Sequence, residues 1–302
     1  MAVLIGCDFS SRPGRRKPIV IARGSSANGW VVLESLERLE SLPDFAAWVA
    51  RPGDWVGGFD FPFGLPRELV EQLGWPPVWD DCIRHYAGLS RKEIRDQFAE
   101  FCAARAVGAK FAHRATDRPA GSSPSMKWVN PPVAYMLHAG VPPLIAAGVF
   151  LPGLHAAGPG NLDACGRPRR IALEAYPGLL AREVLGGSSY KSDDKRKQSP
   201  LRLAQRERLL GALEAGGTRL GLRLGLTRAQ SVSLLMDASG DSLDAVLCLV
   251  QAAWGAQRGG PWFGLPETLD PLEGWVVSAL PGPQAPQGNA GPPQVSLLPL
   301  TL

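Results

Sequence analysis

Five acidic residues mark the places in this sequence where chemistry is expected. Asp8 ends the apolar run "AVLIGCD", Asp60 ends "WVGGFD", and Glu174 ends "RRIALE". Asp241 and Asp244 stand three residues apart in "GDSLDAVLCLVQAAW", so a helix there places both on one face of its first turn. Two bare carboxylates ~4 Å apart repel by about 4 kcal/mol at an effective dielectric of roughly 20, so a cluster of them predicts a compensating cation.

Carboxylate oxygens are the donors that magnesium and manganese prefer in proteins. Two such ions roughly 4 Å apart can activate a water molecule and stabilise the leaving oxygen of a phosphodiester. We therefore expect Mg²⁺ or Mn²⁺ to be bound by all five acids, which are Asp8, Asp60, Glu174, Asp241 and Asp244. The expected catalytic set is the same without Asp241, and Lys191 is expected to steady the charged transition state.

Several of these acids also have a purely structural explanation. Asp241 is a natural helix N-cap, and Asp244 suits the positive end of the helix dipole in the first turn. Glu174 could pair with Arg169 or Arg170 at the start of its own strand. The functional hypothesis depends on whether the acids share one edge of the fold.

Short apolar segments separated by turn signals occupy the first sixty or so residues. The expected elements are three strands, a helix and a fourth strand, at residues 2–9, 18–24, 29–36, 42–53 and 54–62. This order is typical of an α/β sheet whose first and fourth strands lie parallel and adjacent. Parallel strands end at the same edge of a sheet, so Asp8 and Asp60 are expected to emerge together.

Residues 64–167 interrupt this pattern and are expected to form a mainly helical insertion. They contain the helical stretch "SRKEIRDQFAEFCAARAVG" (90–108), followed by the passage "RPAGSSPSMKWVNPP", rich in turn residues. The core resumes with a strand in "RRIALEAYP", and helices follow in "PGLLAREVLGG" and "SGDSLDAVLCLVQAAWGA". One domain is therefore expected over residues 1–278, with 279–302 as a flexible Pro/Gly-rich tail.

Basic, amide and aromatic residues near these segments are candidates for substrate binding. Lys195 belongs to the run "KSDDKRK", although a mixed charge run is also typical of a solvated loop. The insertion contributes Arg114 and Asp117 in "HRATDRP" and Lys127 and Asn130 in "MKWVNPP". Such residues can contact phosphates and stack on bases of a single strand.

The composition is ordinary for a soluble globular protein, with 45% hydrophobic and 20% charged residues. No stretch approaches the ~20 unbroken apolar residues that a membrane helix needs, and the amino terminus resembles a strand rather than a leader. The five cysteines are scattered and never spaced as CxxC, which favours reduced thiols in the cytoplasm and argues against zinc. The net charge of +4 permits a nucleic-acid partner.

The order of these elements resembles the ribonuclease H-like superfamily, and in particular the predicted nucleases of the family called domain of unknown function 429. The segments that carry the resemblance span most of residues 1–278 and are "IGCDFSS", "GGFDFPFGLP", "LEAYPGLLAREVLG", "GDSLDAVLCLVQA" and "GLPETLDPLEGWVVS". The resemblance implies a mixed five-stranded α/β sheet of order 3-2-1-4-5, flanked by helices, and metal-dependent phosphodiester cleavage. Holliday-junction resolvases of this superfamily carry Glu as the second core acid, whereas this chain has Asp60.

The leading hypothesis is a divalent-metal-dependent nuclease that hydrolyses phosphodiester bonds of a nucleic acid with metal-activated water. One alternative is a nucleic-acid-binding or scaffold protein whose ribonuclease H-like site is weak or inactive. Another is an actin-like phosphotransferase, which also begins with a strand and an Asp but needs a second glycine-rich phosphate loop that the sequence lacks. Neither GxxxxGK(S/T) nor GxGxxG follows any expected strand, so P-loop and Rossmann cofactors are not expected.

Overall fold

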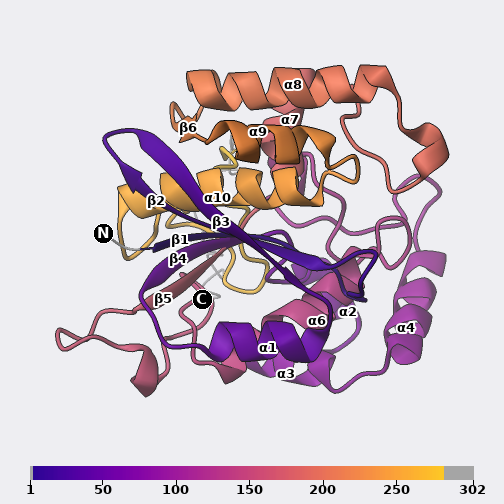
Figure 1. Cartoon of the computed structure of the whole chain (residues 1–302). Coiled ribbons are helices and arrows are strands. Elements are labelled where there is room, and N and C mark those ends of the chain that lie inside the picture. Colours follow the sequence, from indigo (N-terminus) through magenta and orange to yellow (C-terminus); the bar gives the residue numbers. More distant parts are fainter. Residues whose placement is uncertain (1–2, 282–302) are drawn as a thin grey trace, which may run out of the picture.

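A mixed β-sheet organises the chain in the computed structural model, which describes residues 3–281 (Figure 1). Its six strands lie in the order β5-β4-β1-β2-β3-β6. Their bounds, from β1 to β6, are Val3–Asp8, Ile19–Ala27, Trp30–Leu39, Trp55–Phe59, Arg170–Glu174 and Arg223–Gly225. The chain therefore has the expected α/β class, with helices on both faces of the sheet (Figure 1).

The central strand β1 pairs antiparallel with β2 and parallel with β4, and β4 pairs parallel with β5. In this register Cys7 lies beside Phe59, and Phe59 lies beside Glu174. The three parallel strands therefore end together, and Asp8, Asp60 and Glu174 reach the same edge of the sheet. In α/β folds this carboxyl edge is where ligands bind.

The sheet has six strands where five were expected, because Arg223–Gly225 pairs parallel with the start of β3. This segment has only three residues, of which Leu224 is the buried one, so it contains no apolar run or alternation of strand length. Most of the expected tail, residues 282–302, lies outside the described part of the chain.

Helix α10 (Asp241–Arg258) lies across one face of the sheet and contacts β1, β2 and β4 (Figure 1). A Cβ atom on Gly6 of β1 would lie 2.0 Å from the carbonyl oxygen of Ala245. A Cβ atom on Gly58 of β4 would lie 2.5 Å from the carbonyl oxygen of Cys248. Only glycine at these two positions lets the helix backbone approach the sheet so closely, which places the start of α10 beside the ends of β1 and β4.

A second layer of helices covers the outer side of α10 (Figure 1). These helices are α7, α8 and α9, which span Pro177–Leu185, Pro200–Ala215 and Arg228–Met236. Since α10 has neighbours on both sides, its side chains from Asp241 to Gly255 are all buried. This helix is therefore buried around nearly its whole circumference.

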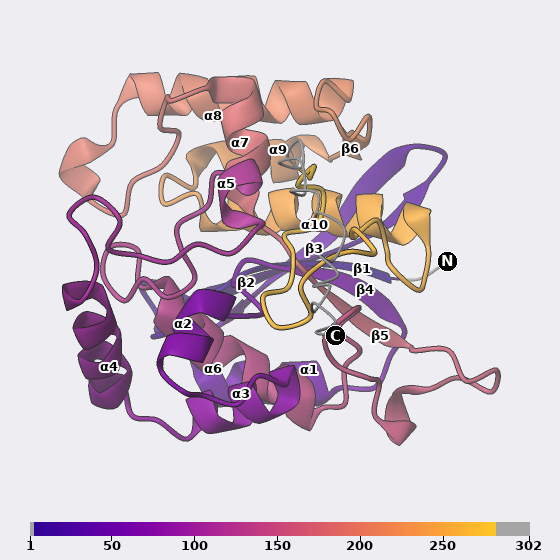
Figure 2. The same cartoon turned by 180° about the vertical axis from the view of Figure 1, so that it is seen from behind.

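The opposite face of the sheet is covered by α1 and by helices of residues 64–167 (Figure 2). These helices are α1 (Leu42–Ala50), α2 (Arg67–Gln72), α3 (Trp79–Ala87) and α6 (Val133–Ala146), and α4 (Arg91–Ala103) lies at the margin of this layer (Figure 2). The short helix α5 (Asp117–Ala120) lies instead near α7, where Arg182 donates to the carbonyl oxygen of Ala120 at 2.8 Å (Figure 2). Residues 64–167 thus contribute helices to both sides of the sheet.

Local signals explain where several helices begin. A capping box of Ser90 and Glu93 starts α4, which ends at Ala103 rather than at the expected residue 108. Two short 3-10 helices, η1 (Pro159–Asn161) and η2 (Lys195–Lys197), occupy loops. Among the residues that the structure describes, no helix has both the length and the apolar character needed to cross a membrane.

Candidate active site

Asp8 and Asp60 lie side by side where the parallel strands β1 and β4 end. The backbone N–H of Asp60 donates to the carbonyl oxygen of Cys7 at 2.9 Å, which extends the strand pairing by one residue. Phe59 and Phe61 both pack into the aromatic core beneath α1, with ring centroids 5.7 Å apart. The carboxylate between them lines a cavity at the sheet edge, and so does Phe61, whereas Phe59 lies only in the core.

Neither of these two carboxylates has a hydrogen-bond or ion-pair partner among residues 3–281. Asp8 is nevertheless buried, with 8% of its surface exposed. A buried carboxylate without partners is costly, because it loses its hydration and gains nothing in return. The pair is therefore a natural binding place for a cation or for a donor on a ligand.

Asp244 completes the cluster from the first turn of α10. It is fully buried, and its two oxygens are held by the Tyr190 hydroxyl and the Lys191 ammonium group. Gly240, which precedes the helix with a φ of 79°, makes this contact possible, because a Cβ there would lie 2.8 Å from the Cβ of Lys191. The lack of a side chain at Gly240 thus allows Tyr190 and Lys191 to lie against Asp244.

The protonation behaviour of the cluster follows from burial and mutual repulsion. Burial, followed by the charge of Asp244, raises the pKa of Asp8 well above its usual value. The same two causes raise the pKa of Asp60 to about 7. Burial also raises the pKa of Asp244, while the neighbouring Lys191 opposes that rise. Perturbed carboxylates gathered at one sheet edge are typical of functional sites.

Asp241 lies at the start of α10 but faces a different cation. Its carboxylate is 3.5 Å from the Nζ atom of Lys17, which also binds Asp193 at 2.8 Å. The N-cap position of α10 is Gly240, so Asp241 does not cap the helix as its sequence context allowed. Asp237 performs the related task by accepting the backbone N–H of Ser242 at 2.9 Å.

Glu174 reaches the same edge, yet both of its oxygens are already bound. Arg114 donates to them at 2.6 and 2.8 Å, and the backbone N–H of Phe63 donates at 2.9 Å. The alternative partner Arg170 instead donates to Asn161 at 2.9 Å. A metal ligand was expected to have a free carboxylate, but the carboxylate of Glu174 is bound to Arg114.

Arg114 and Asp117, which were expected to bind substrate, are buried inside the protein. All five N–H donors of the Arg114 guanidinium are satisfied, by Asp117, Glu174 and the carbonyl oxygen of Glu273. No donor remains for a phosphate group. These two residues therefore form a structural link that fastens the insertion to strand β5.

The other three expected substrate residues lie on or near the surface. Lys195 is exposed in η2, Asn130 is exposed, and Lys127 is half-buried. Pro131, next to Asn130, lines the cavity beside Asp60, whereas Lys127 and Asn130 themselves do not. Their side chains thus flank the site without forming its wall.

The cavity beside Asp60 has a volume of about 220 Å³ and joins the acid edge to the insertion. Asp60, Lys191 and the Arg114–Glu174 pair form its charged side. Its remaining wall combines hydroxyl groups with apolar surface, from Ser122, Ser123, Tyr176, Phe61, Pro62, Pro131, Val133, Met136, Ala175 and Val276. A cavity of mixed polarity beside perturbed acids is where a substrate group is expected to bind.

The donor set fits a hard divalent cation in its chemistry, although the present side-chain arrangement does not yet form a cage. Asp8, Asp60 and Asp244 offer only oxygen donors, and two of them lack partners. Across residues 3–281, no three His, Cys, Asp or Glu side chains are already arranged to hold one metal ion. Lys191 pairs with Asp244, so a metal ion bound by Asp244 would require this ammonium group to move aside.

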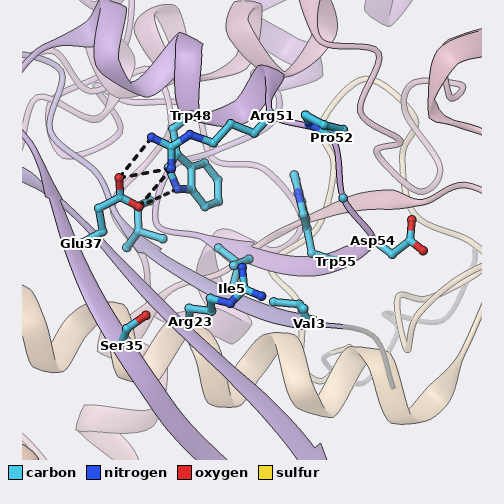
Figure 3. Close-up of a pocket in the computed structure, with 12 residues that line it drawn as sticks. Val3, Ile5, Arg23, Ser35, Glu37, Trp48, Arg51, Pro52, Asp54 and Trp55 are labelled. Carbon is cyan, nitrogen blue, oxygen red and sulfur yellow. Dashed lines mark hydrogen bonds and ion pairs between the residues drawn. The ribbon is translucent and has the colours of Figure 1, made fainter.

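A second hollow of about 270 Å³ lies at the opposite edge of the sheet, by the amino ends of β1 and β4 (Figure 3). Trp48 and Trp55 form part of its wall, and Glu37 binds Trp48 and Arg51 beside it (Figure 3). None of the five acids lines it. The five candidate acids are therefore absent from the lining of this hollow, and Asp8, Asp60 and Glu174 lie at the carboxyl edge instead.

Two residues of the site, Tyr190 and Lys17, were not singled out from the sequence. Tyr190 stands directly before Lys191, and Lys17 ends the basic run "RPGRRK" that follows the Asp8 strand. Their proximity in sequence to site residues was the only signal. No family model, curated protein or solved structure matches the chain, so the geometry of the site carries the functional argument.

Proposed function

We propose that this chain is a divalent-metal-dependent nuclease with a ribonuclease H-like core. The single observation that carries the proposal is the meeting of the buried Asp8 and the half-buried Asp60, both without partners in the described part of the chain, beside Asp244. The run β3-β2-β1-β4-β5 within the sheet supports the core assignment and the resemblance to the domain of unknown function 429 family.

Asp8, Asp60 and Asp244 would hold Mg²⁺ or Mn²⁺ in this proposal. When bound, such a cation supplies Lewis-acid stabilisation to a phosphodiester and its attacking water. Tyr190 keeps Asp244 oriented through its hydroxyl group, and the Arg114–Glu174 pair keeps the cavity wall in place. The chain thus orients one of its three oxygen donors through a neighbouring hydrogen bond, as metal sites commonly do.

Lys191 has a second task once it leaves Asp244. Its side chain is 41% exposed and lines the cavity next to Asp60, so its ammonium group can reach a phosphate oxygen there. A cation placed beside developing negative charge stabilises the transition state. The hydroxyl and apolar groups of the cavity would receive the sugar or base attached to that phosphate.

The test is a cleavage assay in Mn²⁺ with labelled single-stranded, duplex, hybrid and branched nucleic acids. Asp60→Asn and Asp8→Asn are expected to abolish cleavage. The matched control is Asp54→Asn, at the opposite end of the same strand, where the carboxylate is exposed and pairs with Arg169 at 3.3 Å. Equal activity in the Asp54→Asn and Asp60→Asn proteins would refute the site assignment.

Thermal unfolding gives a readout that does not depend on turnover. A ligand at ~100 times its dissociation constant stabilises the folded state by about 2.7 kcal/mol. Mn²⁺ is therefore expected to raise the Tm of the wild type and of Asp54→Asn but not of Asp8→Asn. Glu174→Gln is expected to retain the shift, because its carboxylate holds Arg114 rather than the metal site.

One observation favours the second candidate, a nucleic-acid-binding or scaffold protein. Lys191 and Arg114 already neutralise Asp244 and Glu174 without a metal. A protein that binds nucleic acid without cleaving it would need no metal ion in addition to these two neutralising side chains. Nucleic-acid binding without any Mn²⁺-induced rise in Tm and without cleavage would select this candidate.

A further inference from the structure

The loop between β1 and β2 carries an unusual concentration of positive charge. Its sequence "SSRPGRRKP" holds Arg12, Arg15, Arg16 and Lys17 and contains no acidic residue. The three arginines are exposed, and none of them forms an ion pair within residues 3–281. Exposed cations gathered without acidic partners are the electrostatic signature of an anion-binding surface.

The loop has a defined conformation that presents two of these arginines. Gly14 and Lys17 exchange backbone hydrogen bonds of 3.2 and 3.0 Å and so close a tight turn. Arg15 and Arg16 occupy the two central positions of this turn. Their guanidinium groups therefore extend from the tip of the loop into solvent.

Contacts at both sides hold the turn against the rest of the protein. On one side, Arg91 of α4 donates to the carbonyl oxygen of Ser11. On the other side, Lys17 binds Asp193 at 2.8 Å and Asp241 at 3.5 Å. An anchored turn loses little conformational entropy when it binds a ligand.

The turn also lies close to the acid cluster. Val20 of β2 pairs with Asp8, and Lys17 precedes Val20 by three residues, a rise of about 10 Å in a strand. One strand of duplex DNA carries a phosphate for every ~3.4 Å of helix axis. A strand with its reacting phosphate at Asp8 and Asp60 would thus bring phosphates a few nucleotides away to the turn.

We propose that the β1–β2 turn binds the phosphate backbone of a nucleic-acid strand through Arg12, Arg15 and Arg16, and guides that strand across the acid cluster. Guanidinium groups suit this task because they bind phosphates with two parallel hydrogen bonds. The inference rests on the proposed function for its choice of ligand. It adds the surface that holds the substrate outside the cavity.

The test measures how binding of a fluorescent oligonucleotide depends on salt, in a chelating buffer that prevents cleavage. Each lost phosphate contact reduces the slope of log K against log salt by ~0.7 for a single strand and ~0.9 for duplex DNA. Arg15→Gln/Arg16→Gln is therefore expected to reduce the slope by about 1.4 to 1.8. Raising the salt from about 50 to about 200 mM weakens binding in both proteins. The factor by which it does so is about 7- to 12-fold smaller in this variant than in the wild type.

The matched control is Arg223→Gln/Arg228→Gln, which removes the same charge from the edge strand β6 and from the start of α9. Arg223 pairs with Trp30 of β3, and Trp30 pairs with Ala27 of β2. Ala27 lies seven residues along β2 from Val20, which is a distance of roughly 20 Å in a strand. This control is expected to keep the wild-type slope. Arg15→Lys/Arg16→Lys is also expected to keep it, because lysine retains the charge.

Two outcomes overturn the inference: an unchanged slope in the glutamine variant at the turn, or an equal reduction in the control. Circular dichroism checks that the variants fold, which is expected because neither turn arginine contacts the core. The result is independent of catalysis. If the glutamine variant at the turn has a reduced slope but the wild type never cleaves, phosphate binding by the turn is supported and the nuclease proposal is refuted. If the wild type cleaves but the slope of the variant is unchanged, only the proposed role of the turn is refuted.

Discussion

The ammonium group of Lys191 pairs with the fully buried carboxylate of Asp244, between the segment after α7 and the first turn of α10. The pair joins two parts of the chain that are 53 residues apart. It neutralises the innermost acid of the site, and it leaves Asp8 and Asp60 as the two unpartnered carboxylates. The charge state of the whole cluster therefore depends on where this one lysine lies.

Removing the lysine is expected to destabilise the metal-free protein. Breaking a fully buried pair costs about 3–5 kcal/mol, and the partial exposure of Lys191 lets water replace some of the lost contact. We expect Lys191→Met to lower the free energy of unfolding by about 2 kcal/mol in urea denaturation. Adding Asp244→Asn should recover most of this loss, and Lys195→Met, at an exposed lysine, should change little. An equal loss in both lysine variants would contradict the pairing.

The stability of the metal-free protein is expected to fall as the pH rises toward neutrality. An unfolded Asp titrates near pH ~4, whereas burial and the charge of Asp244 raise the pKa of Asp60 to about 7. The folded state thus holds this proton more tightly, and the resulting stabilisation is complete below about pH 4 and is lost as the pH rises to about 7.

Denaturation curves in a chelating buffer between about pH 5 and 7 measure this effect. The free energy of unfolding of the wild type should fall more steeply than that of Asp60→Asn, by up to ~1.4 kcal/mol per pH unit. Asp54→Asn should follow the wild type. Parallel curves for the wild type and Asp60→Asn would show that Asp60 is already ionised in this range.

Arg114 is expected to be essential for folding rather than for phosphate binding. Arg114→Met would leave Glu174 and Asp117 buried without their cation, which costs about 3–5 kcal/mol. Arg118→Met, four residues along the same segment and exposed, should alter stability by less than ~0.5 kcal/mol. Both values are measurable by thermal or urea unfolding. A stable Arg114→Met protein with weakened substrate binding would restore Arg114 to the substrate site.

The close contact between β1 and α10 predicts a strong effect of a single methyl group. In Gly6→Ala the added Cβ would lie 2.0 Å from the carbonyl oxygen of Ala245, so helix or strand must shift. We expect a loss of about 3 kcal/mol or more, with cleavage activity lost as Asp244 moves. Gly211→Ala in α8, where nothing lies within 4 Å, should instead stabilise the protein by up to ~1 kcal/mol.

Local sequence was sufficient for the framework that brings Asp8 and Asp60 together. Each acid ends an apolar run of strand length, and the order of the elements between them favours parallel pairing. Successive side chains of a strand point to opposite faces of the sheet, and the end of each strand is marked by the end of its apolar run. The positions of Asp8 and Asp60 therefore follow from short-range patterns. The α/β class and the helix that begins at Asp241 follow from similar patterns.

Tertiary structure alone decided which charges compensate which acids. Glu174 binds Arg114 rather than its neighbours Arg169 or Arg170, and Lys191 lies against Asp244 because Gly240 admits it. The strand at Arg223–Gly225 exists only because the edge of β3 offers it partners. Such contacts join residues far apart in the chain, and their geometry is set by the packing of whole layers, which no local pattern encodes.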